Sequence, residues 1–220
     1  MHIFDNIEDA IIRLSNHAQD FQFPIRNNLK TKSDIINYSV EKSIFRALGV
    51  DNQKPSVVYR SWASINFESL HSQLTNCQNQ DNYNQIIKSF SDSLLIGWTT
   101  STNSKLIYGP ASKIVNLLIK AIQETEQFKI KTIIPFQHVP WDSYTLRPLR
   151  NIINELTSTN YRINIPTSAA MSFVNSPELY DALQKAMFKL YSLIEGQPPT
   201  ICFDYFAWND NHQITAINIS

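Results

Sequence analysis

The stretch "YGPASKIVNLLIK", residues 108–120, combines a turn signal with the start of a strongly patterned helix. Gly109 and Pro110 predict a tight turn, and the apolar side chains after them recur at helical spacing. These are Ile114, Leu117, Leu118, Ala121 and Ile122. Lys113 lies at the edge of this stripe in the predicted first turn, where the partial positive charge of a helix N-terminus disfavours a cation. The sequence predicts a helix over about 109–124, with a lysine near its start that needs an explanation.

The same periodicity recurs along the chain and predicts an all-α fold. Apolar stripes predict further helices over about 4–19, 31–48, 61–77, 81–97, 149–156 and 176–194. Ser176 as N-cap and Pro177 at the first helical position mark the start of the last one. The segments expected to lack helix are "WTTSTNSKLIYGP" at 98–110, the long connection at 126–145 and the irregular stretch from 161 to the Ser176 N-cap. The tail 209–220 is expected to form a short strand or a loose end.

Length and composition predict one compact unit. No long polar linker and no internal repeat interrupts the 220 residues, so we expect a single helical unit over 1–220. The formal net charge is zero, with 19 basic and 19 acidic residues, which disfavours generic nucleic-acid binding but leaves local clusters open. Neither a run of about 18 apolar residues nor a secretory signal is present, so no membrane span and a cytoplasmic location are expected. Cys77 and Cys202 lack metal-ligand spacing and predict free buried thiols.

Lys113 admits two interpretations. As an ordinary feature it is a solvated charge whose aliphatic stem covers the helix edge. As a functional feature it is a nucleophile, because a neutral amine can attack an electrophilic carbon. The preceding turn would also offer backbone N–H groups to a phosphate. A lysine nucleophile and a phosphate site in one element suit an enzyme that acts on a nucleic-acid backbone.

A second informative stretch is "HVPWDSYTLRPLR", residues 138–150. Asp142 follows Pro140 at the predicted mouth of a helix. The structural interpretation is an N-cap, worth about 1 kcal/mol. The functional interpretation is a carboxylate that the cap position aims at a reaction centre, where it stabilises positive charge or accepts a proton. His138 also has two interpretations, one as a general base or DNA contact and the other as a structural histidine.

Together these stretches resemble the helix-hairpin-helix DNA glycosylases. In that family a Gly-x-Gly-x-Lys hairpin precedes a helix and its lysine attacks the sugar C1′, while a Val-Pro-x-Asp-x-(His/Tyr) segment supplies an aspartate. The corresponding segments here are Gly109-Pro110-Ala111-Ser112-Lys113 and Val139-Pro140-Trp141-Asp142-Ser143-Tyr144. The resemblance implies Lys113 and Asp142 as catalytic residues. It also implies contacts to the DNA backbone from Gly109, Ala111 and Ser112.

A third segment points to one branch of that family. Lys113 and Asp142 are further apart than in most 8-oxoguanine glycosylases of this fold, which is similar to the compact archaeal-type enzymes. Those enzymes read the extruded base with an Asp and a Trp four residues apart, and "FDYFAW" places Asp204 and Trp208 at that spacing. The structural alternative for this segment is an aromatic core cluster with a helix cap. The resemblance implies a hairpin and catalytic segment at about 81–156 and a base-pocket segment at about 198–209.

The match departs from the family pattern at three positions. Ala111 replaces the second hairpin glycine, Pro110 removes a backbone donor, and Leu117 occupies the position of an aromatic residue that stacks on the base. Phe136 or Trp141 could supply that stacking surface instead.

The implied activity is that of a DNA glycosylase and AP lyase. It would excise 8-oxoguanine from double-stranded DNA through a lysine Schiff base, without a metal or an organic cofactor. The alternative is a catalytically altered member that binds nucleic acid, a nucleotide or a protein partner, since similar small glycosylase-like proteins are encoded in bacterial anti-phage operons. The oligomeric state stays open.

Overall fold

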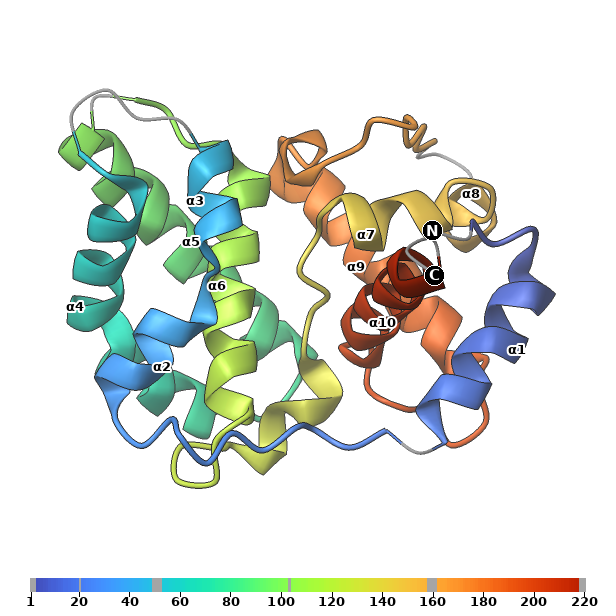
Figure 1. Ribbon diagram of the computed structural model, residues 1–220, viewed down its shortest axis with the longest axis horizontal. Coiled ribbons are helices and arrows are strands. Elements are labelled where there is room, and N and C mark those ends of the chain that lie inside the picture. The colour runs from blue at the N-terminus through green and yellow to red at the C-terminus, as the bar shows by residue number, and fades with distance from the viewer. Residues whose placement is uncertain (1–2, 20, 49–52, 103, 158–161, 218–220) are drawn as a thin grey trace. The chain divides into compact units, whose positions relative to one another are not determined.

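The computed structural model describes residues 3–19, 21–48, 53–102, 104–157 and 162–217, with side chains as far as residue 209. Every regular element within these ranges is a helix, so the predicted all-α class is confirmed (Figure 1). The chain forms two compact units, one from Phe23–Phe136 and one from Met1–Gln22 together with Gln137–Ser220. The expectation of a single functional unit over 1–220 stays a prediction.

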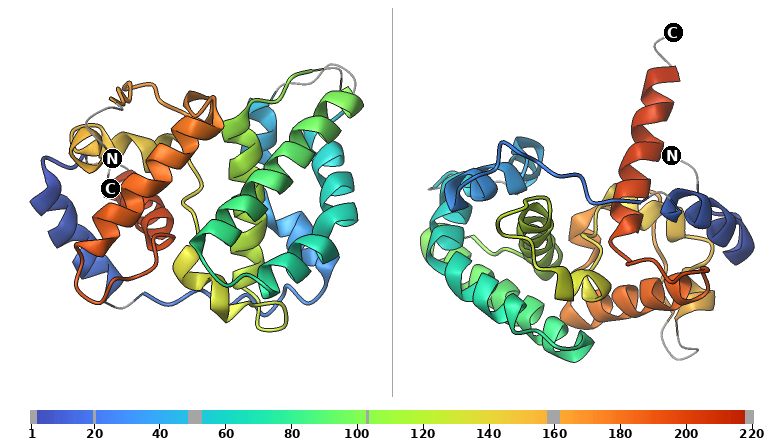
Figure 2. Two further views of the ribbon diagram at one scale, coloured as in Figure 1. Left: turned by 180° about the vertical axis from the view of Figure 1, so that it is seen from behind. Right: turned by 90° about the horizontal axis from the view of Figure 1, so that it is seen from below.

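The described residues of the central unit form six helical elements. They are α2 (Lys32–Ser39), α3 (Lys42–Ala47), α4 (Pro55–Thr75), α5 (Gln80–Thr102), α6 (Tyr108–Gln123) and the 3-10 helix η1 (Lys131–Phe136). Helices α4 and α5 pack against each other, and α6 packs on α5 and α2 (Figure 2). The core of this unit comes from the apolar stripes that predicted the helices. Leu70, Leu74, Ile87 and Ile114 are fully buried.

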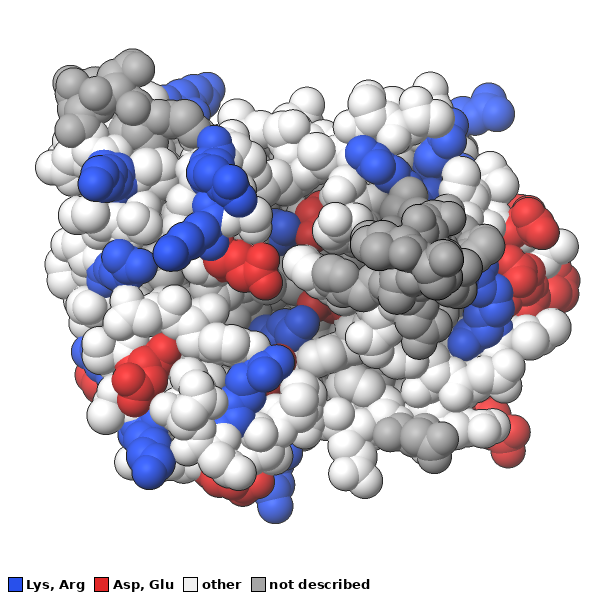
Figure 3. All heavy atoms as spheres, in the orientation of Figure 1, with Lys and Arg blue, Asp and Glu red and all other residues white. Residues whose placement is uncertain are grey.

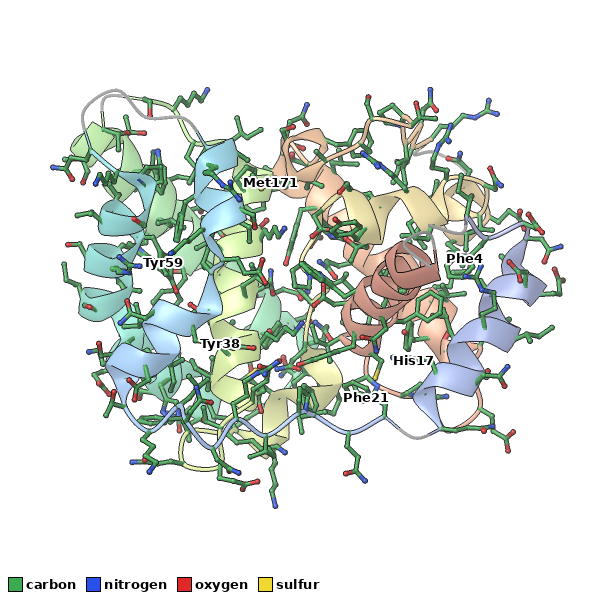
Figure 4. The ribbon with its side chains drawn as sticks, viewed as in Figure 1. Phe4, His17, Phe21, Tyr38, Tyr59 and Met171 are labelled. Atoms are coloured by element: carbon green, nitrogen blue, oxygen red, sulfur yellow. The ribbon has the colours of Figure 1, made fainter. Side chains whose placement is uncertain are left out.

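The predicted helix over 31–48 is two helices, so that prediction is wrong in one respect. Val40 lies between them in an extended conformation, with φ −126° and ψ 117°. The Ser39 hydroxyl bonds the carbonyl of Ile36 at 3.0 Å and also bonds the hydroxyl of Tyr59 on α4, which Figure 4 labels. Such side-chain bonds to nearby backbone compete with helix propagation. The decisive partner, Tyr59, is distant in sequence and could not be inferred from the local pattern.

Helix α5 continues five residues past its predicted end, through a segment expected to be a loop. Thr99, Thr100 and Thr102 donate their hydroxyl protons to the carbonyls four residues earlier, at 3.1, 2.9 and 2.9 Å. This pattern lets threonine satisfy its polar group inside a helix. Helix α4 in turn starts six residues before its predicted beginning, with Pro55 in its first turn, where a missing N–H is harmless.

The other unit contains α1 (Ile7–Ala18), α7 (Ser143–Leu146), α8 (Ile153–Leu156), α9 (Pro177–Ser192), α10 (Cys202–Ile217) and the 3-10 helices η2 (Arg147–Leu149) and η3 (Met171–Phe173). Helix α10 packs on α7 and α1, and α9 packs on α8 and α1. The Ser176 hydroxyl accepts from the N–H of Leu179 at 3.2 Å, which confirms the predicted N-cap. The predicted helix around 149–156 is instead a series of short pieces, interrupted near Pro148.

Helix α10 corrects the prediction for the tail, because residues expected to be a strand or a loose end continue the helix to Ile217. Its aromatic side chains form part of the core with α1. The Phe4 ring lies 6.2 Å from that of Phe203 and 5.9 Å from that of Phe206, and His17 meets Phe206 edge-on at 5.6 Å. Figure 4 labels Phe4 and His17. The aromatic-core interpretation of this segment is therefore confirmed for Phe203, whereas Phe206 is partly exposed.

Two further sequence predictions concern the cysteines and membrane-spanning helices. Cys77 and Cys202 are free and buried, as predicted. Burial raises the pKa of the Cys202 thiol to about 12. Among the described residues, none of the helices combines the length and the apolarity that crossing a membrane requires.

Candidate functional site

The predicted site residues fall into both units. The unit formed by the two chain ends holds His138, Trp141, Asp142, Asp204 and Trp208. The central unit, Phe23–Phe136, holds Gly109, Ala111, Ser112, Lys113 and Phe136.

Asp142 is the N-cap of α7, which confirms the predicted cap. Its carboxylate Oδ1 accepts hydrogen bonds from the N–H groups of Tyr144 at 2.8 Å and Thr145 at 3.1 Å. The Thr145 hydroxyl accepts from the Asp142 N–H at 2.8 Å, so the two residues form a reciprocal capping box. The side chain is buried, with Asp142 only 7% exposed. A carboxylate held in this way has a fixed orientation, which a role in catalysis requires.

The segment that leads to Asp142 is fixed by side chains from elsewhere in the same unit. The carbonyl of Gln137 accepts from the Thr200 hydroxyl at 2.5 Å. The side-chain amide of Gln184 in α9 accepts from the Val139 N–H at 3.0 Å and donates to the Val139 carbonyl at 2.8 Å. Sequence reasoning missed Gln184, although a buried polar residue in the apolar stripe of 176–194 was a usable signal. These bonds hold the segment before the cap in one conformation.

His138 is buried and hydrogen-bonded within this unit. It is 2% exposed, and its Nδ1 is hydrogen-bonded to the Tyr180 hydroxyl at 2.8 Å. The ring of Phe188 meets it edge-on at 5.9 Å. Burial lowers the pKa of His138 to about 3, so its ring is neutral near pH 7. The structural interpretation fits this geometry better than a role as a DNA contact.

The aspartate segment and the "FDYFAW" segment meet within one unit. The Tyr144 ring lies 5.3 Å from the Trp208 ring at an interplanar angle of 60°. Trp208 is partly exposed, whereas Asp204, one helical turn before it on α10, is 1% exposed. Tyr144 is 37% exposed and stands two residues after Asp142. Sequence reasoning gave Tyr144 no role of its own, yet it connects the two predicted motifs.

Trp141 does not offer the stacking surface that the sequence suggested. Its indole is fully buried, and its Nε1–H has no hydrogen-bond partner among the described residues. A large side chain in that position is a core element, so the suggested role of Trp141 is corrected here. Phe136 remains available, because it is partly exposed and lines a pocket of about 550 Å³ at η1 and the α4–α5 turn.

The start of α6 differs from the predicted hairpin. The helix begins at Tyr108, with Ile107 as its N-cap, so Gly109 to Lys113 are helical and Lys113 lies in the second turn. The Ala111 N–H donates to the Ile107 carbonyl at 3.3 Å. A proline in the first helical turn needs no donor, which explains why Gly109-Pro110 is compatible with a helix here.

This geometry changes the setting of the predicted contacts to the DNA backbone, which stay a prediction. The Ala111 N–H is already used within the helix, and the Ser112 hydroxyl donates to the Gly109 carbonyl at 3.1 Å. These groups are therefore unlike the open amide cradle that binds phosphate in a hairpin.

Lys113 is only 6% exposed, so the interpretation as a solvated surface charge is wrong. Buried polar neighbours accompany it on α6. The side-chain amide of Asn116 donates to the Ser112 carbonyl at 2.7 Å, and Asn116 is 2% exposed. Leu117 is partly exposed at the position where the family has an aromatic residue. Ser112, Lys113 and Asn116 are all buried and form a polar strip beside the apolar stripe of α6.

Among the described residues, no group of three His, Cys, Asp or Glu side chains is placed to hold a metal ion. No family model matches the chain, and no curated protein or solved structure matches it with significant similarity.

Proposed function

We propose that this protein is a DNA glycosylase with AP lyase activity that excises 8-oxoguanine through a lysine Schiff base. The observation that carries the proposal is the buried Asp142 carboxylate, fixed at the N-cap of α7 next to the contact between Tyr144 and Trp208. A carboxylate held in one orientation and shielded from water is suited to stabilise the cationic sugar that forms when a glycosidic bond breaks. The nearby aromatic pair is suited to contact the extruded base.

In the proposed reaction the damaged nucleotide leaves the base stack. Trp208 stacks on the base and the Asp204 carboxylate accepts a hydrogen bond from its edge. Asp142 accepts a proton from the Lys113 ammonium and passes it to the departing base. The Lys113 nitrogen bonds to C1′ as the bond from C1′ to the base breaks, and the restored Asp142 carboxylate stabilises positive charge on the sugar. Opening of the sugar ring gives the Schiff base, and β-elimination then expels the 3′ phosphate.

The burial of Lys113 and its polar strip supports its proposed role. At 6% exposure, the amine is shielded from bulk water, which limits hydrolysis of a Schiff base before elimination. The strip also retains polar groups beside the lysine that a purely apolar helix face would lack.

The experiment that tests the proposal is covalent trapping. The protein is incubated with a labelled duplex that contains one 8-oxoguanine, in the presence of borohydride, which reduces a Schiff base to a stable amine. We expect an adduct with the damaged duplex and none with an undamaged one. Lys113→Gln should abolish the adduct. Lys120→Gln is the matched control, because Lys120 lies on the same helix and is partly exposed, and it should leave the yield unchanged.

Two outcomes oppose the proposal. A folded wild-type protein that yields no adduct would contradict the lyase activity. An undiminished adduct in Lys113→Gln would contradict the assignment of the nucleophile. Circular dichroism of each variant separates loss of chemistry from loss of fold.

A second candidate function is a binding module that retains the glycosylase arrangement without its chemistry. The observation that favours it is the start of α6, where Gly109 to Lys113 are helical and the Ala111 N–H donates to the Ile107 carbonyl. Such a module would bind nucleic acid, a nucleotide or a protein partner without a covalent adduct. Equal affinity for damaged and undamaged duplexes, measured by fluorescence anisotropy and combined with a failure to trap, would favour this function.

A further inference from the structure

A groove in the central unit lies among residues that the proposed chemistry does not use. It has a volume of about 910 Å³ and is formed by α2, α3 and the first turns of α4. Its lining residues include Tyr38, Val40 and Phe45 on one side and Pro55, Val57 and Arg60 on the other. None of them belongs to the glycosylase-like motifs, so the groove needs its own explanation.

The floor of the groove is apolar and well anchored. Val40 and Phe45 are 5% and 8% exposed, and the Phe45 ring packs on the Tyr59 ring at 5.7 Å. The lip is more open, with Val57 50% exposed and Tyr38 38% exposed. The Tyr38 hydroxyl donates to the buried Glu124 carboxylate at 3.0 Å, which fixes the ring at the edge of the groove. The side chains of Val40, Phe45, Val57 and Tyr38 together form the apolar surface of the groove, which we call the platform.

Four cations and one carboxylate surround that platform. The cations are Lys42, Arg46, Lys54 and Arg60, and the carboxylate is Glu41. Figure 3 shows Lys and Arg side chains gathered over α3 and α4 on this face. Within the described ranges, none of the four cations forms an ion pair. The Glu41 carboxylate accepts a hydrogen bond from the Ser43 hydroxyl at 3.3 Å.

This lack of ion pairs contrasts with exposed helices elsewhere in the protein. Arg13 pairs with Asp9 at 3.7 Å, Lys88 with Asp92 at 2.7 Å and Lys185 with Asp181 at 3.1 Å, each across one helical turn. The chain as a whole has equal numbers of acidic and basic residues, so a group of unpaired cations around one groove is a local concentration of charge. Unpaired like charges repel each other at separations up to about 8 Å at physiological salt, beyond which the repulsion is largely screened.

We infer that this groove docks an acidic, amphipathic segment of a partner protein. Carboxylates along one side of such a segment would pair with the four cations, and arginine in particular accommodates carboxylate in a two-pronged geometry. Apolar side chains at helical spacing would cover the exposed part of the platform, as in other grooves that bind a helix. A nucleic-acid backbone would satisfy the charges but would leave Val57 and the rest of the apolar lip without a partner.

The test uses synthetic probes and fluorescence anisotropy. The first probe is a labelled helical peptide of about 16 residues, long enough to span roughly 24 Å, with Glu on one face and Leu and Phe on the other. The second keeps the charges but replaces Leu and Phe by Ser, and the third replaces Glu by Lys. The fourth is a single-stranded oligonucleotide of similar net charge. We expect only the first to bind well, with an affinity that falls as salt rises.

Variants separate the groove from general charge. Arg46→Glu with Arg60→Glu should weaken binding of the first peptide by about tenfold or more, because rim charges become repulsive. Val57→Ser should weaken it by about two- to fivefold, as one apolar contact is lost. Lys88→Glu with Lys185→Glu is the matched control for charge reversal on exposed helices and should change the affinity by less than about twofold.

Three outcomes would overturn this inference. They are no binding of the acidic amphipathic peptide to folded wild-type protein, equal weakening by the control reversals, and tighter binding of the oligonucleotide that the groove reversals abolish. Because the groove residues take no part in the proposed excision, the groove variants should keep the wild-type yield of borohydride adduct. Failure of the docking inference and failure of the glycosylase proposal are therefore distinguishable.

Discussion

The rings of Tyr144 and Trp208 lie 5.3 Å apart at an angle of 60°. This contact joins two segments that are far apart in the sequence, since Tyr144 follows Asp142 in the cap of α7 and Trp208 follows Asp204 by one turn of α10. The two motifs that predicted the site in this unit are thus neighbours in space.

Trp208→Ala should weaken binding of a duplex with 8-oxoguanine by about 1–3 kcal/mol, the usual contribution of base stacking on an aromatic side chain. Because Trp208 is partly exposed, the stability loss should be smaller than the roughly 3–5 kcal/mol of a buried tryptophan. Trp141→Ala is the control for that larger loss, since Trp141 is fully buried. Urea unfolding and lesion affinity should be measured on the same samples. Severe destabilisation by Trp208→Ala, with unchanged lesion affinity in the folded fraction, would show that the segment "FDYFAW" contributes only to core packing.

Asp204→Asn should change which base is accepted, because an amide both donates and accepts hydrogen bonds whereas a carboxylate only accepts. Excision should be compared on duplexes that carry 8-oxoguanine, guanine and a range of other oxidised bases. An unchanged order of preference would remove Asp204 from the base-reading role.

Asp142→Asn should separate capping from catalysis. Asparagine caps helices about as well as aspartate and can still accept from the N–H groups of Tyr144 and Thr145. Stability should change little, while excision should fall by about 100-fold or more because the negative charge is lost. Thr145→Val is the converse control. It removes the acceptor for the Asp142 N–H and should cost about 1 kcal/mol of stability. Parallel losses of melting temperature and activity in Asp142→Asn would indicate a structural role alone.

His138 should make stability depend on pH. Its pKa in the folded protein is about 3, below the ordinary value of 6.5, so the unfolded chain binds more protons between these values. The contribution of His138 to the free energy of unfolding is therefore complete above about pH 6.5. It is lost as pH falls towards 3, with a slope of up to about 1.4 kcal/mol per pH unit.

His138→Gln should flatten this dependence in urea unfolding between pH 4.5 and 7.5. Some slope should remain, because burial also lowers the pKa of His17. Tyr180→Phe removes the hydrogen bond but keeps the ring buried, so it should retain most of the pH dependence. Identical slopes in wild type and His138→Gln would contradict the neutral buried ring.

Sequence periodicity predicted the helices whose cores are built from local stripes, such as α1, α5, α6 and α9. It failed where a distant partner decides the backbone, as at Ser39, whose hydroxyl bonds Tyr59 on another helix. It also failed where hydroxyl residues satisfy themselves inside a helix, as Thr99 does at the end of α5. Composition alone favours a loop in such segments, because it does not show whether a hydroxyl bonds within its own helix or to a distant residue.

In the candidate site, too, features set by neighbouring residues could be predicted, whereas features set by distant residues could not. The N-cap at Asp142 was readable because the capping residue and the turn before it are adjacent in sequence. The residues from Gly109, predicted to form a hairpin, are helical instead. Gly-Pro is compatible with both a turn and a first helical turn, so the local sequence does not distinguish the two. The bonds of Gln184 to Val139 and the contact of Tyr144 with Trp208 join distant segments, so no local pattern could have predicted them.

The most direct test of the central claim is to locate the trapped adduct on the chain. Wild-type protein is reduced with borohydride on a duplex containing 8-oxoguanine, digested with a protease and a nuclease, and analysed by tandem mass spectrometry. We expect a single modified residue, Lys113, carrying the reduced sugar remnant on its side-chain nitrogen. An adduct on Lys120 or any other amine, or no adduct from folded protein, would contradict it.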